Sequence, residues 1–128
     1  MRISLTSVPI ADYDQALAFY TSVLGFEKKR DIPLGDGARW LTVVSPEEPN
    51  GTEVVLEPMG FPPARTYQKA LFEAGIPLTA FQVEDIQKEY ARMKKLGVVF
   101  KGEPKKTGPV TLCAFEDTCG NLIQLYQV

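Results

Sequence analysis

The chain has 128 residues, a formal net charge of −2 at pH 7, and no histidine. A chain of this length is expected to fold as a single domain over residues 1–128. The near-neutral charge gives no general attraction to nucleic acid or to an anionic membrane surface, so neither is expected as a partner. The missing histidine excludes Ser–His and Cys–His nucleophile systems and any acid–base chemistry that depends on imidazole.

The first residues and the cysteines both predict a cytoplasmic location. Residues 1–6 have strand character and lack the apolar run of a signal peptide, and no segment is long enough to span a bilayer. Cys113 and Cys119 are six residues apart and form no CxxC pair. We therefore expect two reduced cytosolic thiols, with Cys113 packed inside a strand and Cys119 in a turn.

The first half of the chain predicts a strand, a helix and three further strands. Residues 3–10 are rich in β-branched types and predict a strand. Asp12 and Gln15 form a capping-box pattern at the start of a helix, and Gly25 ends that helix. Turn-forming residues then separate three expected strands, at about 26–31, 39–45 and 52–57.

The second half repeats this order after an extra helix, which is expected over about 62–75 and links the halves. A strand near 78–83, a helix from Asp85 to Gly97, and strands near 98–103, 110–116 and 121–127 follow. Asp12 and Asp85, which begin the two corresponding helices, are 73 residues apart. The repeat predicts an α+β fold of two βαβββ modules, at about 1–60 and 76–128, whose curved mixed sheets form a cup.

The residues of the repeat also carry a family resemblance. The stretch from Asp12 to Phe26, with Ala-Phe-Tyr inside and Leu-Gly-Phe at its end, resembles the vicinal oxygen chelate superfamily. This superfamily comprises glyoxalases, bleomycin-resistance proteins and extradiol dioxygenases. The closing Phe-x-Asp-x-x-Gly-Asn-x-Ile-x-Leu pattern, from Phe115 to Leu125, resembles the same group. The resemblance implies a small-molecule site and a homodimer whose modules are exchanged or packed side by side.

The resemblance also implies where a metal would be held, and this chain departs from that pattern. Metal-using members carry ligands on the first and last strands of each module, commonly His on the first strands and Glu on the last. The matching positions here are Leu5 and Leu78 on the first strands, and Glu57 and Gln124 on the last strands. Because leucine has no donor atom, we predict no transition metal and no other cofactor. A remnant site for a weakly held divalent cation would use Glu57 and Gln124.

Six side chains are expected to line the cup: Leu5, Arg39, Trp40, Glu57, Leu78 and Gln124. Glu57 would act as a general acid or base if desolvation raised its pKa. Arg39 would pair with a carboxylate, and Trp40 would form an aromatic wall. Because neighbours on a strand point to opposite faces, only one of these two can face the cup. The amide of Gln124 would orient a ligand, although each of these residues could also be an ordinary strand or surface residue.

Together these features predict a protein that binds a small organic molecule without a transition metal. Two enzymatic alternatives stay open. The first is a lyase or isomerase that acts on a small carbonyl or amino-acid-like compound with Glu57 as the base. The second is a metal-dependent glyoxalase-type enzyme or dioxygenase with oxygen ligands such as Glu53, Glu57 and Gln124.

Overall fold

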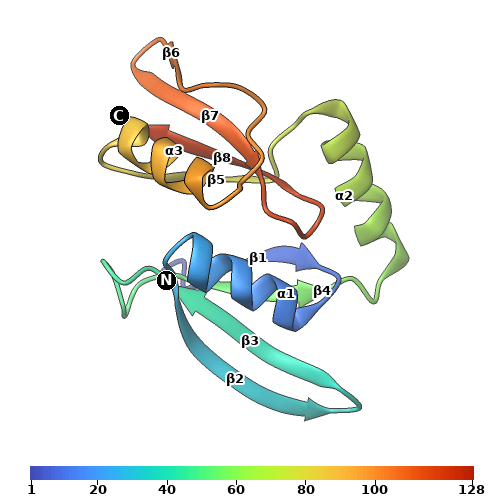
Figure 1. The fold of residues 1–128 in the computed structure, drawn as a ribbon. Coiled ribbons are helices and arrows are strands. Elements are labelled where there is room, and N and C mark those ends of the chain that lie inside the picture. The colour runs from blue at the N-terminus through green and yellow to red at the C-terminus, as the bar shows by residue number, and fades with distance from the viewer. The chain divides into compact units, whose positions relative to one another are not determined.

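The computed structural model describes residues 1–128, which divide into two compact units, Met1–Pro62 and Pro63–Val128. Each unit contains a four-stranded mixed sheet, which confirms the α+β fold of two βαβββ modules (Figure 1). The first unit contains β1 (Leu5–Ile10), α1 (Tyr13–Ala18), the π-helical turn η1 (Phe19–Val23), β2 (Glu27–Gly35), β3 (Ala38–Val44) and β4 (Glu53–Pro58). The second contains β5 (Thr79–Gln82), α3 (Ile86–Lys95), β6 (Lys105–Thr107), β7 (Val110–Glu116) and β8 (Leu122–Gln127), and all but the first residue of the linker helix α2 (Pro62–Ala74). None of the helices has the length and apolarity that a membrane crossing needs.

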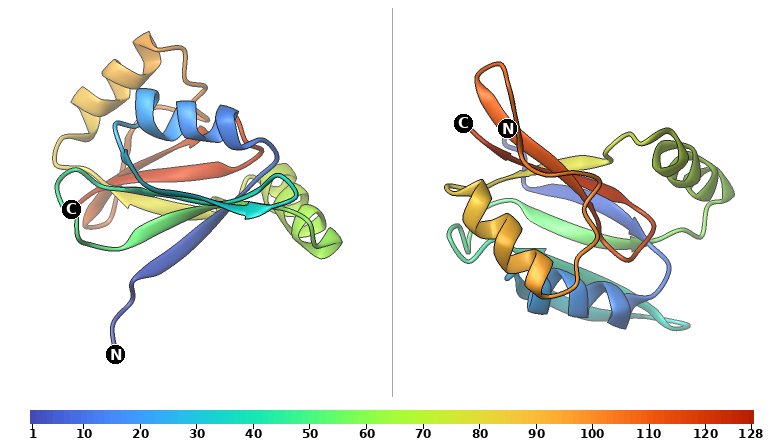
Figure 2. Two further views of the ribbon diagram at one scale, coloured as in Figure 1. Left: turned by 90° about the horizontal axis from the view of Figure 1, so that it is seen from below. Right: turned by 45° about the horizontal axis from the view of Figure 1, so that its top comes forward.

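The first sheet has the strand order β1-β4-β3-β2, and α1 lies over one of its faces (Figure 2). β1 and β4 are parallel, with Val8 opposite Leu56, and both of these residues are fully buried. Because alternate residues point to opposite faces, Val8, Ile10, Leu56 and Val43 form the core on the α1 side. The opposite side is called the open face of the first sheet.

The second sheet repeats this arrangement, with strand order β5-β8-β7-β6 and α3 alongside it. The helix-side core contains Ile123 and Phe115, both fully buried and directly opposite each other on β8 and β7. Tyr90 of α3 packs edge-on against Phe100 at a centroid distance of 4.6 Å, and Phe100 in turn contacts Phe115. Gln124 points to the other side, which is called the open face of the second sheet.

The two capping aspartates form the bonds that the repeat predicts. Asp12 Oδ1 accepts a hydrogen bond from the Gln15 backbone N–H at 2.7 Å, and Asp85 Oδ1 accepts one from Lys88 at 3.0 Å. The first helix then widens at its end, where the Leu24 N–H donates to the Phe19 carbonyl five residues back. Gly25 follows with a φ of 83°, a conformation that glycine adopts without strain.

Two strand predictions differ from the structure. The strand expected near 98–103 is wrong, because β6 is Lys105–Thr107 and Phe100 makes only an isolated bridge to Phe115. Gly102 lies inside this segment and Pro104 directly follows it, and proline has no N–H to donate to a ladder. β2 continues to Gly35 rather than ending near residue 31, through a proline that is tolerated because β2 is an edge strand.

A hydrogen-bond network in the β7–β8 turn anchors α2 to the second sheet. The fully buried carboxylate of Asp117 accepts bonds from the Cys119 and Asn121 backbone N–H groups, at 2.8 and 3.0 Å, and from the Asn121 side-chain amide at 2.7 Å. The Gln68 amide of α2 donates to Asn121 Oδ1 at 2.9 Å and to the Cys119 carbonyl at 3.0 Å. These bonds give α2 a fixed attachment, although none of its residues is buried.

The thiol of Cys113 is expected to react slowly with alkylating and disulfide reagents. Cys113 is 5% exposed on β7, and burial raises the pKa of its thiol to about 11. Only about one molecule in a thousand would then carry the reactive thiolate at pH 8. In a Cys119→Ser variant, labelling by a thiol-specific disulfide reagent should therefore be slow in buffer and fast in denaturant. Rapid labelling of the folded variant at pH 8 would contradict this expectation.

Candidate functional site

Trp40 lies on the open face of the first sheet, in the middle of β3. It stands directly opposite Ile32 of β2 in the strand register, and the indole is half-buried while Ile32 is 48% exposed. Leu5 points to the same side from β1 and is 47% exposed. The open face of the first sheet therefore presents an aromatic ring together with accessible aliphatic side chains.

Arg39, the neighbour of Trp40, lies on the α1 side instead. Its Nε and Nη2 atoms bond both oxygens of Asp31 at 3.0 and 2.8 Å, and its Nη1 atom bonds Asp14 at 2.9 Å. The guanidinium also lies over the Tyr13 ring, 5.1 Å from its centroid. These bonds raise the pKa of Arg39 above its ordinary value. Of the two neighbours, Trp40 is thus the one on the open face, and a ligand-binding role for Arg39 stays a prediction.

The Arg39–Asp31 pair predicts that stability depends on pH in the acid range. The hydrogen bond from Arg39 holds the pKa of Asp31 below its ordinary value. A carboxyl whose pKa is lower in the folded state stabilises that state above its unfolded pKa of about 4, and the effect is lost as pH falls through the folded pKa. Arg39→Gln should therefore lower the urea midpoint at pH 7 by more than it does near pH 3. An equal shift at both pH values would contradict this pH dependence.

Two carboxylates on the open face of the first sheet have different surroundings. Glu53 Oε1 accepts a hydrogen bond from the Thr42 hydroxyl at 2.7 Å and pairs with Arg30 Nε at 3.1 Å. These bonds, with the larger effect from Thr42, hold the pKa of Glu53 below its ordinary value. Glu57, opposite Pro9, is exposed and makes no hydrogen bond or ion pair. Of these two carboxylates, Glu57 is therefore the one that is free to meet a ligand.

The open face of the second sheet carries Gln124, which is half-buried and stands opposite Ala80 and Ala114. Leu78 precedes β5, is half-buried, and donates its backbone N–H to the Leu122 carbonyl at 2.8 Å. Tyr126 lies two residues beyond Gln124 on the same face, and its hydroxyl bonds Gln82 at 3.3 Å. Small alanines beside Gln124 leave its amide accessible from this face.

Two residues on the open faces, Tyr126 and Ile32, were not among the predicted site residues. Tyr126 could have been found from the strand period of two, counted from Gln124. Ile32 could not, because its place beside Trp40 depends on the β2–β3 register and on the extension of β2 past Asp31.

The donor chemistry of the predicted metal positions does not fit a transition metal. Leu5 and Leu78 offer hydrocarbon only, and no group of three or more His, Cys, Asp or Glu side chains gathers in the protein. Glu53, the additional oxygen ligand of the metal-dependent alternative, already bonds Thr42 and Arg30. A first-row transition metal needs three or more protein ligands, usually with imidazole or thiolate among them.

Residues 2–125 match the Glyoxalase/Bleomycin resistance protein/Dioxygenase superfamily. The chain belongs to this superfamily. The resemblance of the Asp12–Phe26 and Phe115–Leu125 motifs is thereby confirmed over nearly the whole chain.

Three similar proteins span almost the full length. The uncharacterized protein YurT of Bacillus subtilis (strain 168) is 54% identical and covers 99% of each chain. The crystal structure of UcmS2 has a TM-score of 0.84 and 34% identity, covering 98% of this chain and 97% of that one. TnmS3, an antibiotic binding protein from Streptomyces sp. CB03234, has a TM-score of 0.78 and 30% identity, covering 99% and 95%.

Proposed function

We propose that this chain binds a small aromatic organic molecule on the open face of its first sheet without using a transition metal. The observation that carries the proposal is the half-buried indole of Trp40 on an open sheet face beside Ile32 and Leu5. Ligand sites are mostly apolar surfaces with a few polar groups that orient the ligand. The likeness to TnmS3 supports an antibiotic as the class of molecule bound.

The apolar and the polar side chains have different roles in binding. The indole offers a flat apolar surface on which an aromatic ring can stack. In the second unit, the Gln124 amide can both donate and accept a hydrogen bond, and the Tyr126 hydroxyl lies on the same face of that sheet. Leu5 in the first unit and Leu78 in the second each offer hydrocarbon at a position where the resemblance implies a metal ligand in metal-using members.

The test uses the only tryptophan of the chain as a reporter. Titration with bleomycin and with a panel of aromatic antibiotics should quench or shift Trp40 emission in a saturable way for at least one compound. The same compound should raise the melting temperature, because a ligand that binds the native state stabilises it. Free N-acetyltryptophanamide serves as the control for optical artefacts. No change in emission or melting temperature with any compound would reject the proposal.

The free carboxylate of Glu57 favours a second candidate, a lyase or isomerase that acts on a small carbonyl or amino-acid-like compound. Glu57 lies on the same open face as Trp40 and is exposed. Under the binding proposal, a bound compound should be recovered unchanged, and Glu57→Gln should retain the affinity. Conversion of the compound by the wild type, abolished in Glu57→Gln, would favour the enzyme instead.

We further propose that the protein acts as a homodimer in the cytoplasm. The superfamily resemblance supports the dimer, and the two cysteines, Cys113 and Cys119, which form no disulfide, support a reducing compartment. Light scattering coupled to size exclusion should give twice the mass of the chain. A mass of one chain at micromolar concentration would contradict the dimer.

A further inference from the structure

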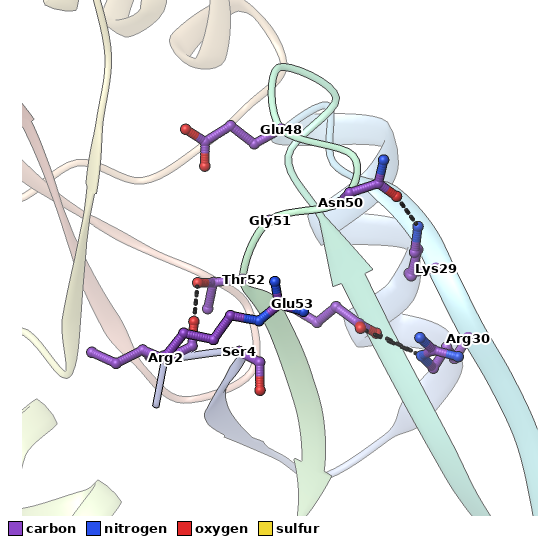
Figure 3. Close-up of a pocket in the computed structure, with 10 residues that line it drawn as sticks. Arg2, Ser4, Lys29, Arg30, Glu48, Asn50, Gly51, Thr52 and Glu53 are labelled. Carbon is purple, nitrogen blue, oxygen red and sulfur yellow. Dashed lines mark hydrogen bonds and ion pairs between the residues drawn. The ribbon is translucent and has the colours of Figure 1, made fainter.

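A polar pocket lies at the edge of the first sheet, where β1 and β4 begin. Its volume is about 420 Å³, and its walls come from the chain start, β2 and the loop before β4 (Figure 3). Three basic side chains, Arg2, Lys29 and Arg30, contribute to the lining, together with two carboxylates, Glu48 and Glu53. Of these residues, only Glu53 was a predicted site residue, as an oxygen ligand in the metal-dependent alternative.

One of the two carboxylates is already neutralised. Glu53 is bonded by Thr42 and by Arg30 Nε, and its side chain is only 13% exposed. Thr42 is fully buried, so it holds the carboxylate in place, and the carboxylate in turn orients the guanidinium. The two terminal amino groups of Arg30 make no bond within the protein and stay available as a planar pair of donors.

The other basic groups also keep donor capacity. Lys29 Nζ donates to the Pro49 carbonyl at 2.7 Å and to Asn50 Oδ1 at 3.4 Å, which leaves one of its three protons. Arg2 makes no hydrogen bond or ion pair. The carboxylate of Glu48 points away from Lys29 and Arg30 (Figure 3). The free donors of the pocket are therefore mainly cationic.

The pocket adjoins the surface that carries Trp40. Arg30 stands opposite Thr42, and Ile32 stands opposite Trp40, so all four residues lie on the open face of the first sheet. Arg30 and Ile32 are two residues apart, a separation of about 7 Å along the strand. A ligand of modest size can therefore contact both the indole and the guanidinium.

We propose that this pocket binds an anionic group, a carboxylate or sulfonate, carried by the aromatic molecule that lies against Trp40. The inference rests on the proposed function and narrows its ligand class to anionic aromatic compounds. Arginine suits this task because its fork of N–H donors matches two oxygens of one anion. Lys29 and Arg2 add positive charge to the pocket, but their donors are not held in a fixed orientation as those of Arg30 are.

The test compares two probes with the same aromatic rings. 1-Anilinonaphthalene-8-sulfonate carries a sulfonate, and N-phenyl-1-naphthylamine lacks it. The wild type should bind the sulfonate about tenfold more tightly, with weaker binding at high salt. Arg30→Lys keeps a cation beside Glu53 but removes the planar fork, and it should weaken sulfonate binding about tenfold. Arg2→Gln should weaken it several-fold, and neither variant should change binding of the naphthylamine.

Lys28→Gln is the matched control, because it removes one charge from the same strand on the α1 side. It should leave both affinities unchanged. Displacement of the sulfonate, but not of the naphthylamine, by millimolar inorganic phosphate would support an anion pocket that also accepts a free anion. Equal affinity for both probes, insensitive to Arg30→Lys, would overturn the anion pocket and leave aromatic binding intact. If neither probe altered Trp40 emission, both proposals would fail.

Discussion

Replacing Asp117 with alanine is expected to lower the free energy of unfolding by about 3 kcal/mol. The Asp117 carboxylate is fully buried and accepts three hydrogen bonds, from the Cys119 and Asn121 backbone N–H groups and the Asn121 amide. Alanine would leave these donors without an acceptor in the interior. Because small domains are stable by only about 5–15 kcal/mol, a loss of this size is large.

Urea unfolding should be followed by far-UV circular dichroism, because Trp40 reports directly on the first unit and Asp117 lies in the second. Asp117→Asn is the graded control. It keeps one acceptor oxygen but brings a second amide N–H₂ group toward the Asn121 amide, so an intermediate loss is expected. Asp12→Ala, which removes an exposed helix cap, should cost only about 1 kcal/mol. A loss below that value for Asp117→Ala would show that the turn network contributes little.

A second change acts on the same network from the α2 side. Gly120 has a φ of 96°, and a β-carbon added there would lie 3.0 Å from Gln68 Oε1. Gly120→Ala should therefore strain the turn and push Gln68 away from Asn121. Its effect and that of Gln68→Ala should be less than additive in a double variant, because both act on one attachment. Full additivity would mean that the strain at Gly120 does not act through Gln68.

The fold was predictable because its signals are local and occur twice. In each module the first strand is followed by a capping aspartate, an amphipathic helix and a glycine in the left-handed conformation, and all three act within a few residues of chain. The strand near 98–103 was mispredicted because apolar content outweighed Gly102 and Pro104. Whether a strand forms there depends on whether the neighbouring strand can pair with a segment in which proline supplies no backbone N–H donor. The local sequence does not contain that information.

The site was predictable only in part. Strand alternation required that Arg39 and Trp40 face opposite sides, but it did not say which one faces the helix. That choice follows from Asp31 and Asp14, whose carboxylates meet Arg39 only after β2, β3 and α1 have packed together. The anion pocket was missed for the same reason. Arg2, Lys29 and Arg30 are far apart or simply charged in the linear sequence, and they line one pocket only because the chain start, β2 and the loop before β4 come together in the fold.

Replacing Trp40 with alanine is expected to weaken binding of an anionic aromatic probe by about 30- to 100-fold. The loss combines the apolar area of the indole with the stacking energy, together about 2–3 kcal/mol. Trp40→Phe keeps a ring at the same position, so its loss should stay below about tenfold. Affinity must be measured by calorimetry or by the fluorescence of 1-anilinonaphthalene-8-sulfonate, since the variants lack the intrinsic reporter.

Comparison of Trp40→Ala with Arg39→Gln tests which of these two neighbouring residues contacts the ligand. Arg39 bonds Asp31 and Asp14 on the α1 side, so its removal should lower stability but leave the affinity for the probe unchanged. Trp40→Ala should do the reverse, with a small change in the urea midpoint and a large change in affinity, because the indole is only half-buried and lies on the open face. Equal affinity loss in both variants would mean that the effects come from general damage to β3. A loss of affinity in Arg39→Gln alone would mean that the ligand binds on the α1 side of the sheet, and it would overturn the proposed site.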